Sequence, residues 1–191
     1  MPVIEGAAVA LGIAYLLLAI RERRSCWIAG GAASLLFLYV LWDADLSMQA
    51  LLQIYYLLVA VHGWWHWGRD ERAIDPRRAS ATQHVTVIVA CLTLGAITQS
   101  LRAGWADPTG WFDSLTSWGG VLATWLVARK VIEAWLYWIL IDAATAALYI
   151  HAGLLASSAL YIVYTGLAFV AFREWRRHYL NLQPGPASAS A

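Results

Sequence analysis

The sequence predicts an all-α integral membrane protein with seven transmembrane helices. Of its 191 residues, 61% are apolar and only 13% are charged, and the mean hydropathy is +0.58. Soluble domains carry about 25% charged residues, so a chain this poor in charge cannot cover a water-facing surface. Runs such as Ala14 to Ile20 are apolar throughout, whereas the strands of a membrane barrel alternate between apolar and polar residues. These observations favour spanning helices.

Each predicted span is an apolar stretch close to the roughly 20 residues that a spanning helix needs, and charged or polar residues mark its ends. In chain order, the spans cover residues 3–20, 26–42, 48–67, 84–101, 111–128, 132–150 and 153–172. The start of the first span carries Glu5 and no basic residue, which is unlike a cleavable signal peptide. We therefore expect the first span to remain in the mature protein.

The basic residues predict the orientation, because Lys and Arg are retained on the cytoplasmic side. If the seven spans alternate in direction, twelve of the thirteen basic residues fall on one side, and only Arg102 falls on the other. The twelve are Arg21, Arg23, Arg24, Arg69, Arg72, Arg77, Arg78, Arg129, Lys130, Arg173, Arg176 and Arg177. The prediction is a multi-pass protein of the cell (inner or plasma) membrane, with the N-terminus outside and the C-terminus cytoplasmic. Residues 181–191, rich in Pro, Gly, Ser and Ala, are expected to form a disordered tail.

Composition and motifs exclude several functional classes. The net charge of +1 leaves no basic excess for a phosphate backbone, so nucleic acid is not expected as a partner. The two cysteines, Cys26 and Cys91, have no metal-binding or disulfide spacing, and no cofactor is expected. The motifs of zinc proteases, α/β-hydrolases and P-loop proteins are absent, so the chain is not expected to be an enzyme. A retinal sensor needs a lysine in its seventh helix, but the single lysine is Lys130.

One transmembrane domain is predicted over residues 1–180, and it contains an internal repeat. The same spacings of three and eleven residues occur in Gln53, Tyr56, Trp67 and in Tyr161, Tyr164, Trp175. Upstream, Tyr39 ends a span led by Trp27, and Tyr149 ends a span led by Trp138. The repeats are expected at about residues 3–67 and 111–175, with a linker helix at about 84–101. Both repeats begin outside, which predicts a 3+1+3 parallel-repeat, SWEET-like bundle.

The candidate site is centred on Asp142, because an ionisable residue at bilayer depth usually marks a functional site. Helical spacing places polar and aromatic side chains on the same face of the span as Asp142. The spans at residues 48–67 and 153–172 each carry a further polar and aromatic face. The predicted solute-binding residues are Gln53, Tyr56, Trp64, Trp138, Asp142, Thr145, Tyr149, Tyr161 and Tyr164. Interhelical hydrogen bonding is the structural alternative for the Gln and Tyr residues taken singly.

The chemistry of these side chains predicts the class of solute. Indole and phenol faces attract organic cations, a carboxylate supplies the counter-charge, and amide and hydroxyl groups can bind a sugar. No Arg or Lys lies inside a predicted span, so a phosphate group would lack a counter-charge. Five tryptophans at predicted span ends are expected to form interfacial belts. They are Trp42, Trp67, Trp105, Trp111 and Trp175.

In order and spacing, these residues resemble the PnuC family of nicotinamide riboside transporters over most of the chain. One block is Gln53-x-x-Tyr56 followed by Gly63 to Trp67, and the other runs from Asp113 through Asp142 to Tyr164. The resemblance implies a homotrimer that takes up nicotinamide riboside, an NAD precursor, by facilitated transport. It also implies that a cytosolic kinase traps the riboside by phosphorylation, which feeds NAD biosynthesis.

Two departures from the family pattern bear on the solute. The family often has Asn where this chain has Asp142, and often has Gln near Thr124. An acidic residue favours a cationic riboside or thiamine over neutral riboflavin, and both vitamins are carried by relatives. Transport of thiamine or another vitamin therefore stays open as the alternative, and a membrane-embedded enzyme or sensor is the distant one.

Overall fold

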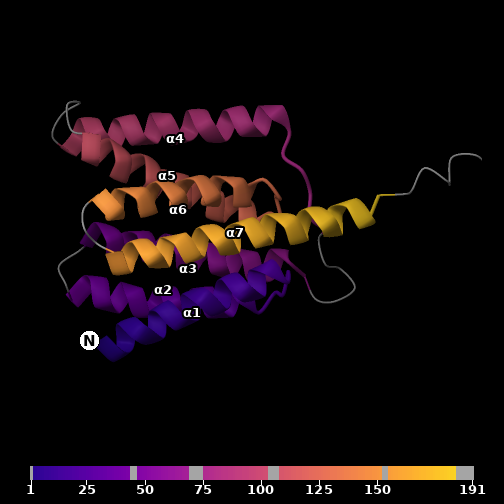
Figure 1. The fold of residues 1–191 in the computed structure, drawn as a ribbon, viewed down its shortest axis with the longest axis horizontal. Coiled ribbons are helices and arrows are strands. Elements are labelled where there is room, and N and C mark those ends of the chain that lie inside the picture. Colours follow the sequence, from indigo (N-terminus) through magenta and orange to yellow (C-terminus); the bar gives the residue numbers. More distant parts are fainter. Residues whose placement is uncertain (1, 44–46, 69–74, 103–107, 152–154, 184–191) are drawn as a thin grey trace, which may run out of the picture.

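The computed structural model describes residues 2–43, 47–68, 75–102, 108–151 and 155–183, and within them the chain is helical (Figure 1). The helices are α1 (Pro2–Ile20), α2 (Cys26–Asp43), α3 (Ser47–His66), α4 (Ala81–Arg102), α5 (Pro108–Ala128), α6 (Ala134–His151) and α7 (Leu155–Asn181). Among the described residues, α2, α4 and α6 contain stretches long and apolar enough to cross a membrane, and Gly6–Ile20 is a shorter apolar helix.

The seven helices confirm the predicted helical segments, with one difference at the C-terminus. Other boundaries agree within three residues, but α7 continues to Asn181, well beyond the predicted end at residue 172. The charged residues after position 172 end the apolar stretch, but they do not end the helix. One helical turn apart, Glu174 and Arg177 form an ion pair at 2.6 Å, which supports the helix there. Most of the predicted tail lies outside the described residues.

The helices form two neighbouring groups, α1–α3 and α5–α7, with α4 at one edge of the bundle (Figure 1). Within the groups, α2 packs on both α1 and α3, and α6 packs on both α5 and α7. Between the groups, α1 packs on α7 and α3 packs on α5. Helix α4 packs mainly on α5, and it also meets α6, where His84 Nδ1 lies 2.6 Å from Tyr137 Oη.

One end of the bundle, which we call the basic end, collects the ends of α1, α3 and α5 and the starts of α2 and α6. Arg24 Nε donates to Trp64 O at 2.6 Å, and Lys130 Nζ lies 2.7 Å from a Glu22 carboxylate oxygen. These contacts join segments that carry most of the basic residues of the chain. The structure therefore places at one end of the bundle the segments that the charge pattern assigned to one side of the membrane.

Residues 75–80 are tied to the basic end beside the start of α6. Arg77 N donates to Lys130 O at 2.9 Å, and the Glu133 carboxylate accepts from Arg78 Nε at 3.0 Å and from Ala79 N at 2.8 Å. Burial would raise the pKa of Glu133, but these hydrogen bonds and the charge of Arg78 outweigh it and hold that pKa below its usual value. Glu133 is therefore an ionised anchor for this segment.

Four tryptophans form the core at the basic end. The Trp27 and Trp67 rings lie 5.3 Å apart at 86°, and the Trp135 and Trp175 rings lie 5.4 Å apart at 85°. Trp67 contacts Trp175 at 5.7 Å, which joins the two groups of helices. Because the two contacts have the same geometry, Trp135 is the counterpart of Trp27 in the second group of helices. The sequence comparison matched Trp27 with Trp138 instead, which lies about one helical turn farther along α6.

The predicted belt role of Trp67 and Trp175 is wrong, because they are 2% and 0% exposed. Their indole N–H groups donate to Ala128 O at 3.0 Å and Ala19 O at 2.9 Å, so each caps a helix of the opposite group. Trp42 is 64% exposed at the end of α2, as a belt residue should be, and Trp105 lies outside the described residues.

The close approach of α2 and α3 depends on Gly63. A Cβ atom at this position would overlap the indole ring of Trp27. The Trp27 ring also contacts Tyr15, whose ring centroid lies 5.7 Å away at 59°. A side chain at position 63 would therefore have to displace the indole ring, and only glycine allows this contact.

We predict that Gly63→Ala lowers stability by about 1–3 kcal/mol, because overpacking of a tight core typically costs this much. The matched control is Gly166→Ala in α7, where a Cβ atom meets nothing within 4 Å. That change should leave stability unchanged or raise it by about 0.5–1 kcal/mol. Thermal unfolding of both variants in detergent measures the difference, and equal midpoints would contradict the role of Gly63.

Candidate functional site

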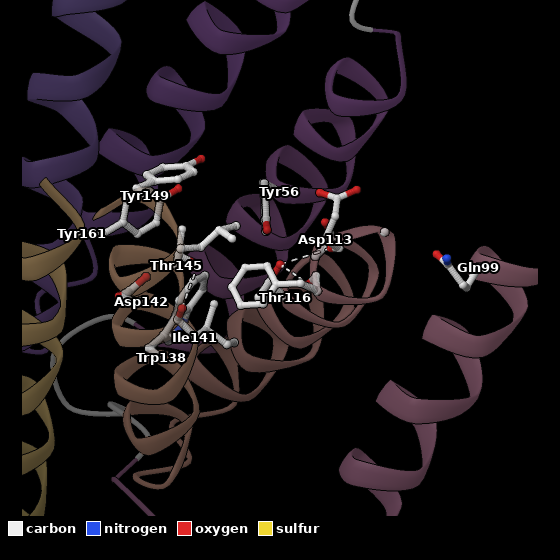
Figure 2. A pocket seen from close by; sticks show the side chains of 15 residues that line it. Tyr56, Gln99, Asp113, Thr116, Trp138, Ile141, Asp142, Thr145, Tyr149 and Tyr161 are labelled. Atoms are coloured by element: carbon white, nitrogen blue, oxygen red, sulfur yellow. Dashed lines mark hydrogen bonds between the residues drawn. The ribbon is translucent and has the colours of Figure 1, made fainter. Parts of the chain in front are cut away.

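Two cavities among the described residues share part of their lining. The first, which we call the polar cavity, has a volume of about 700 Å³ and is lined mainly by α5 and α6, with residues from α3, α4 and α7 (Figure 2). Its lining residues are Tyr56, Gln99, Gly110, Phe112, Asp113, Thr116, Ser117, Gly120, Trp138, Ile141, Asp142, Thr145, Leu148, Tyr149 and Tyr161. Carboxylate, hydroxyl and phenol groups give it the hydrogen-bonding capacity that a hydroxylated solute needs.

The second, which we call the aromatic cavity, has a volume of about 290 Å³ and reaches into α1–α3. Its lining residues are Gly12, Tyr15, Leu16, Trp27, Gly30, Ala33, Ser34, Phe37, Gln53, Tyr56, Ala60, Thr124, Trp135, Trp138, Asp142, Tyr164 and Ala168. The lining consists mostly of ring and aliphatic surface, with a few hydroxyl and amide groups. Such a pocket suits a flat ring held by a small number of polar contacts.

Three side chains line both cavities and form the wall between them: Tyr56, Trp138 and Asp142. Asp142 is only 5% exposed. Among the described residues, the Asp142 carboxylate has no hydrogen-bond or ion-pair partner, and neither Gln53 nor Tyr161 bonds to it. A buried carboxylate is costly unless it is paired, so Asp142 is the residue of this wall that stands out as a candidate for contact with a solute.

Helical spacing on α6 builds one face of the polar cavity. Trp138, Asp142, Thr145 and Tyr149 are three or four residues apart, and all four line it. The Tyr149 ring meets Tyr161 of α7 edge to face at 5.4 Å, which fixes the two phenols beside the carboxylate. Figure 2 shows Asp142, Tyr149 and Tyr161 grouped on one side of the cavity, with Asp113 and Gln99 on the other.

The structure places eight of the nine predicted site residues against the two cavities. Thr145, Tyr149 and Tyr161 line the polar cavity. Gln53 and Tyr164 line the aromatic cavity. The remaining three, Tyr56, Trp138 and Asp142, form the wall and line both cavities.

The ninth predicted residue, Trp64, lies elsewhere. It lines neither cavity, because eight residues beyond Tyr56 a helix has turned about 80° away from the same face. Its ring instead stacks under the Arg24 guanidinium, whose Cζ lies 3.7 Å from the ring centroid. Trp64 therefore belongs to the basic end.

Sequence reasoning missed the residues that α1, α2 and α5 contribute. Tyr15, Ser34 and Thr124 are isolated polar groups in apolar stretches, and no stripe marks them. A better signal was the Gly119-Gly120 pair. A Cβ atom at Gly120 would lie 3.2 Å from Tyr56 Oη and 3.4 Å from Trp138 Cη2, so the glycine lets both wall residues approach α5.

The charge of the lining limits what the cavities can bind. Neither lining contains Arg, Lys or His, so neither offers a counter-charge to a phosphate group. The lining does offer carboxylates and the faces of Tyr and Trp rings, which attract cations. The arrangement can bind and release a cationic or neutral ring compound that carries hydroxyl groups.

The known proteins that this chain is similar to are transporters. The family model described as nicotinamide mononucleotide transporter matches residues 2–177. The riboflavin/roseoflavin transporter RibM of Streptomyces davaonensis is 27% identical over 169 residues, which cover 83% of this chain and 78% of RibM. The nicotinamide riboside transporter PnuC of Escherichia coli is 23% identical over 204 aligned positions, which cover 90% of this chain and 84% of PnuC.

A solved structure has the same fold. The crystal structure of the vitamin B3 transporter PnuC superposes with a TM-score of 0.72 at 19% identity, and the match covers 94% of this chain and 83% of that one. The matched relatives are transporters rather than enzymes. Because the family model spans nearly the whole chain, this protein belongs to the nicotinamide mononucleotide transporter family.

Proposed function

We propose that the protein is a membrane transporter that carries nicotinamide riboside by facilitated diffusion. The observation that carries this proposal is Asp142, a buried carboxylate that has no partner among the described residues and lies in the wall between a polar and an aromatic cavity. Nicotinamide riboside combines a flat, positively charged ring with a hydroxylated sugar. The ring suits the aromatic side chains and the carboxylate, and the sugar suits the hydroxyl and phenol groups of the polar cavity.

The lining favours the riboside over its phosphorylated form. A phosphate group would have to enter cavities that hold carboxylates and no basic side chain. The same property supports trapping in the cytosol. Once a kinase phosphorylates the riboside for NAD biosynthesis, the product cannot return by this route.

Riboflavin is the second candidate solute, because a riboflavin/roseoflavin transporter is 27% identical to this chain. Thiamine is a cation with an aromatic ring and meets the same criteria as the riboside. Riboflavin is neutral and gains nothing from a carboxylate counter-charge. Asp142 therefore favours the cations.

We propose a 3+1+3 arrangement in which α1–α3 and α5–α7 are parallel repeats within residues 1–180 and α4 is the linker, with all seven helices crossing the membrane. The two matched Trp pairs support it, as do the reciprocal indole bonds of Trp67 to Ala128 and Trp175 to Ala19. We also propose a homotrimer, as the family resemblance implies.

We propose that the basic end faces the cytoplasm of the inner membrane, because basic residues are retained on that side. Cysteines introduced by Ala81→Cys and Ser157→Cys should then react with an impermeant thiol reagent from opposite faces. We expect the first to be labelled from inside and the second from outside. Labelling of both from one face would contradict the proposed seven spans.

We predict that Asp142→Asn weakens binding of nicotinamide riboside about tenfold. At an effective dielectric constant near 20, a charge pair at about 4 Å is worth roughly 4 kcal/mol, and desolvation leaves a net of about 1–2 kcal/mol. The reduced riboside has a similar shape and no charge, so its binding should change little. Calorimetry with both ligands on both proteins completes a four-point cycle.

The matched control for this cycle is Asp113→Asn. Asp113 also lines the polar cavity, but it is exposed, so its charge is screened and its loss should change affinity less than about threefold. A coupling energy near zero for Asp142 would show that its carboxylate acts as a structural hydrogen-bonding group. That result would falsify the counter-charge role and leave riboflavin as the better candidate.

We predict that transport is facilitative, because coupled pumps use relays of acids and histidines inside the membrane and the two cavity linings contain no histidine. In proteoliposomes, labelled riboside should equilibrate across the bilayer without accumulating. An imposed proton or sodium gradient should leave the plateau unchanged. Uphill accumulation under either gradient would contradict the prediction.

A further inference from the structure

Glu22 and Lys130 occupy unusual backbone positions at the basic end. Both have φ of 53°, in the left-handed region where glycine is the least costly residue. Each follows a helix that ends in the same way: Glu22 N donates to Ala19 O at 3.0 Å, and Lys130 N donates to Val127 O at 2.9 Å. At both positions, where glycine would be the least strained residue, the chain has a charged residue, and the two charges are opposite in sign. Strained positions of this kind persist where the side chain makes an interaction that the structure depends on.

The two side chains meet each other. Lys130 Nζ lies 2.7 Å from Glu22 Oε2, and the side chains are 4% and 13% exposed. The other carboxylate oxygen, Oε1, lies 2.6 Å from His178 Nδ1 of α7. Lys130 Nζ also lies 4.9 Å from the centroid of the Trp67 ring. One carboxylate thus joins the ends of α1 and α5 to α7.

This cluster closes the basic end beneath the aromatic cavity. Trp27 and Trp135 line that cavity, and they pack against Trp67 and Trp175. Trp67 in turn lies against Lys130. A solute in the cavities therefore meets two layers of indole rings and then an ion pair before it reaches the basic end.

From this arrangement we infer that the Glu22–Lys130 pair, held by His178, is the latch of a gate at the basic end. The inference rests on the proposed transport function, because a carrier must open toward each side in turn. An ion pair suits a latch: separated charges regain hydration, which offsets the Coulomb energy lost on opening. The pair joins α1–α3 to α5–α7, so breaking it removes the ionic connection between the two groups at this end and leaves the neutral indole hydrogen bonds of Trp67 and Trp175.

The test measures access to the cavity from each end of the protein. The introduced thiol is Thr145→Cys, which lines the polar cavity, in a background of Cys26→Ala and Cys91→Ala. Right-side-out and inverted membrane vesicles each expose one end to an impermeant thiol reagent. The readout is the ratio of the labelling rate from the basic end to the rate from the opposite end.

Lys130→Gln and Glu22→Gln should each raise this ratio by roughly tenfold, because loss of the latch shifts the population toward the state open at the basic end. The exchanged pair Glu22→Lys with Lys130→Glu should bring the ratio back toward the wild-type value. A role in stability alone would lower the unfolding temperature without changing the ratio. An unchanged ratio in folded single variants would overturn the inference.

The matched control is Glu133→Gln, which breaks the ion pair with Arg78 at the same end without separating the two groups of helices. Its ratio should stay at the wild-type value, and a rise equal to that of Lys130→Gln would overturn the inference. If Lys130→Gln does not fold, His178→Ala decides, because His178 is 45% exposed and holds only one oxygen of Glu22. A rise supports the latch, and no change overturns it. Labelling needs no solute, so the outcome is independent of whether nicotinamide riboside is carried.

Discussion

The fold depends on how the C-terminal carbonyls of α1 and α5 find donors inside an apolar bundle. The last four carbonyls of any helix lack partners in the helix itself, and water is scarce here. Trp175 of α7 donates to Ala19 O of α1, which also accepts from Glu22 N, and Trp67, the residue after α3, donates to Ala128 O of α5. Each indole bond crosses between the two groups of helices, so it also supports the α1–α7 and α3–α5 contacts. Farther along these helices, Tyr56 of α3 and Tyr164 of α7 line the aromatic cavity together with Asp142.

Small residues decide where the aromatic side chains pack and where they leave space. At Gly63 the Trp27 ring lies directly on the backbone of α3. At Gly120 the wall residues Tyr56 and Trp138 approach α5, and a cavity remains on either side of them. The same residue types therefore build both a sealed end and a binding site. The difference lies in whether the facing helix offers only small apolar groups or hydroxyl groups such as Thr116 and Thr124.

The helices and most of the site could be predicted from the sequence, because apolar length and helical spacing are local properties. The stripe from Trp138 to Tyr149 needs only the 3.6-residue period, and it lines the polar cavity as expected. The exposure of a tryptophan depends instead on which helix lies opposite, so Trp67 and Trp175 were assigned to the membrane interface although they are buried. The place of Tyr15 in the aromatic cavity likewise depends on tertiary packing, which no pattern in α1 records.

The relatives indicate where discrimination between solutes must lie. One carries riboflavin and another carries nicotinamide riboside, so the family keeps one fold for solutes of different charge. Such a change requires few substitutions if it is made where both ends of the solute meet the protein. Asp142 stands at that point, because it lines both the polar and the aromatic cavity. In the proposed binding mode, a single carboxylate or amide there sets the preferred charge of the ring, and the hydroxyl groups of the polar cavity bind the sugar.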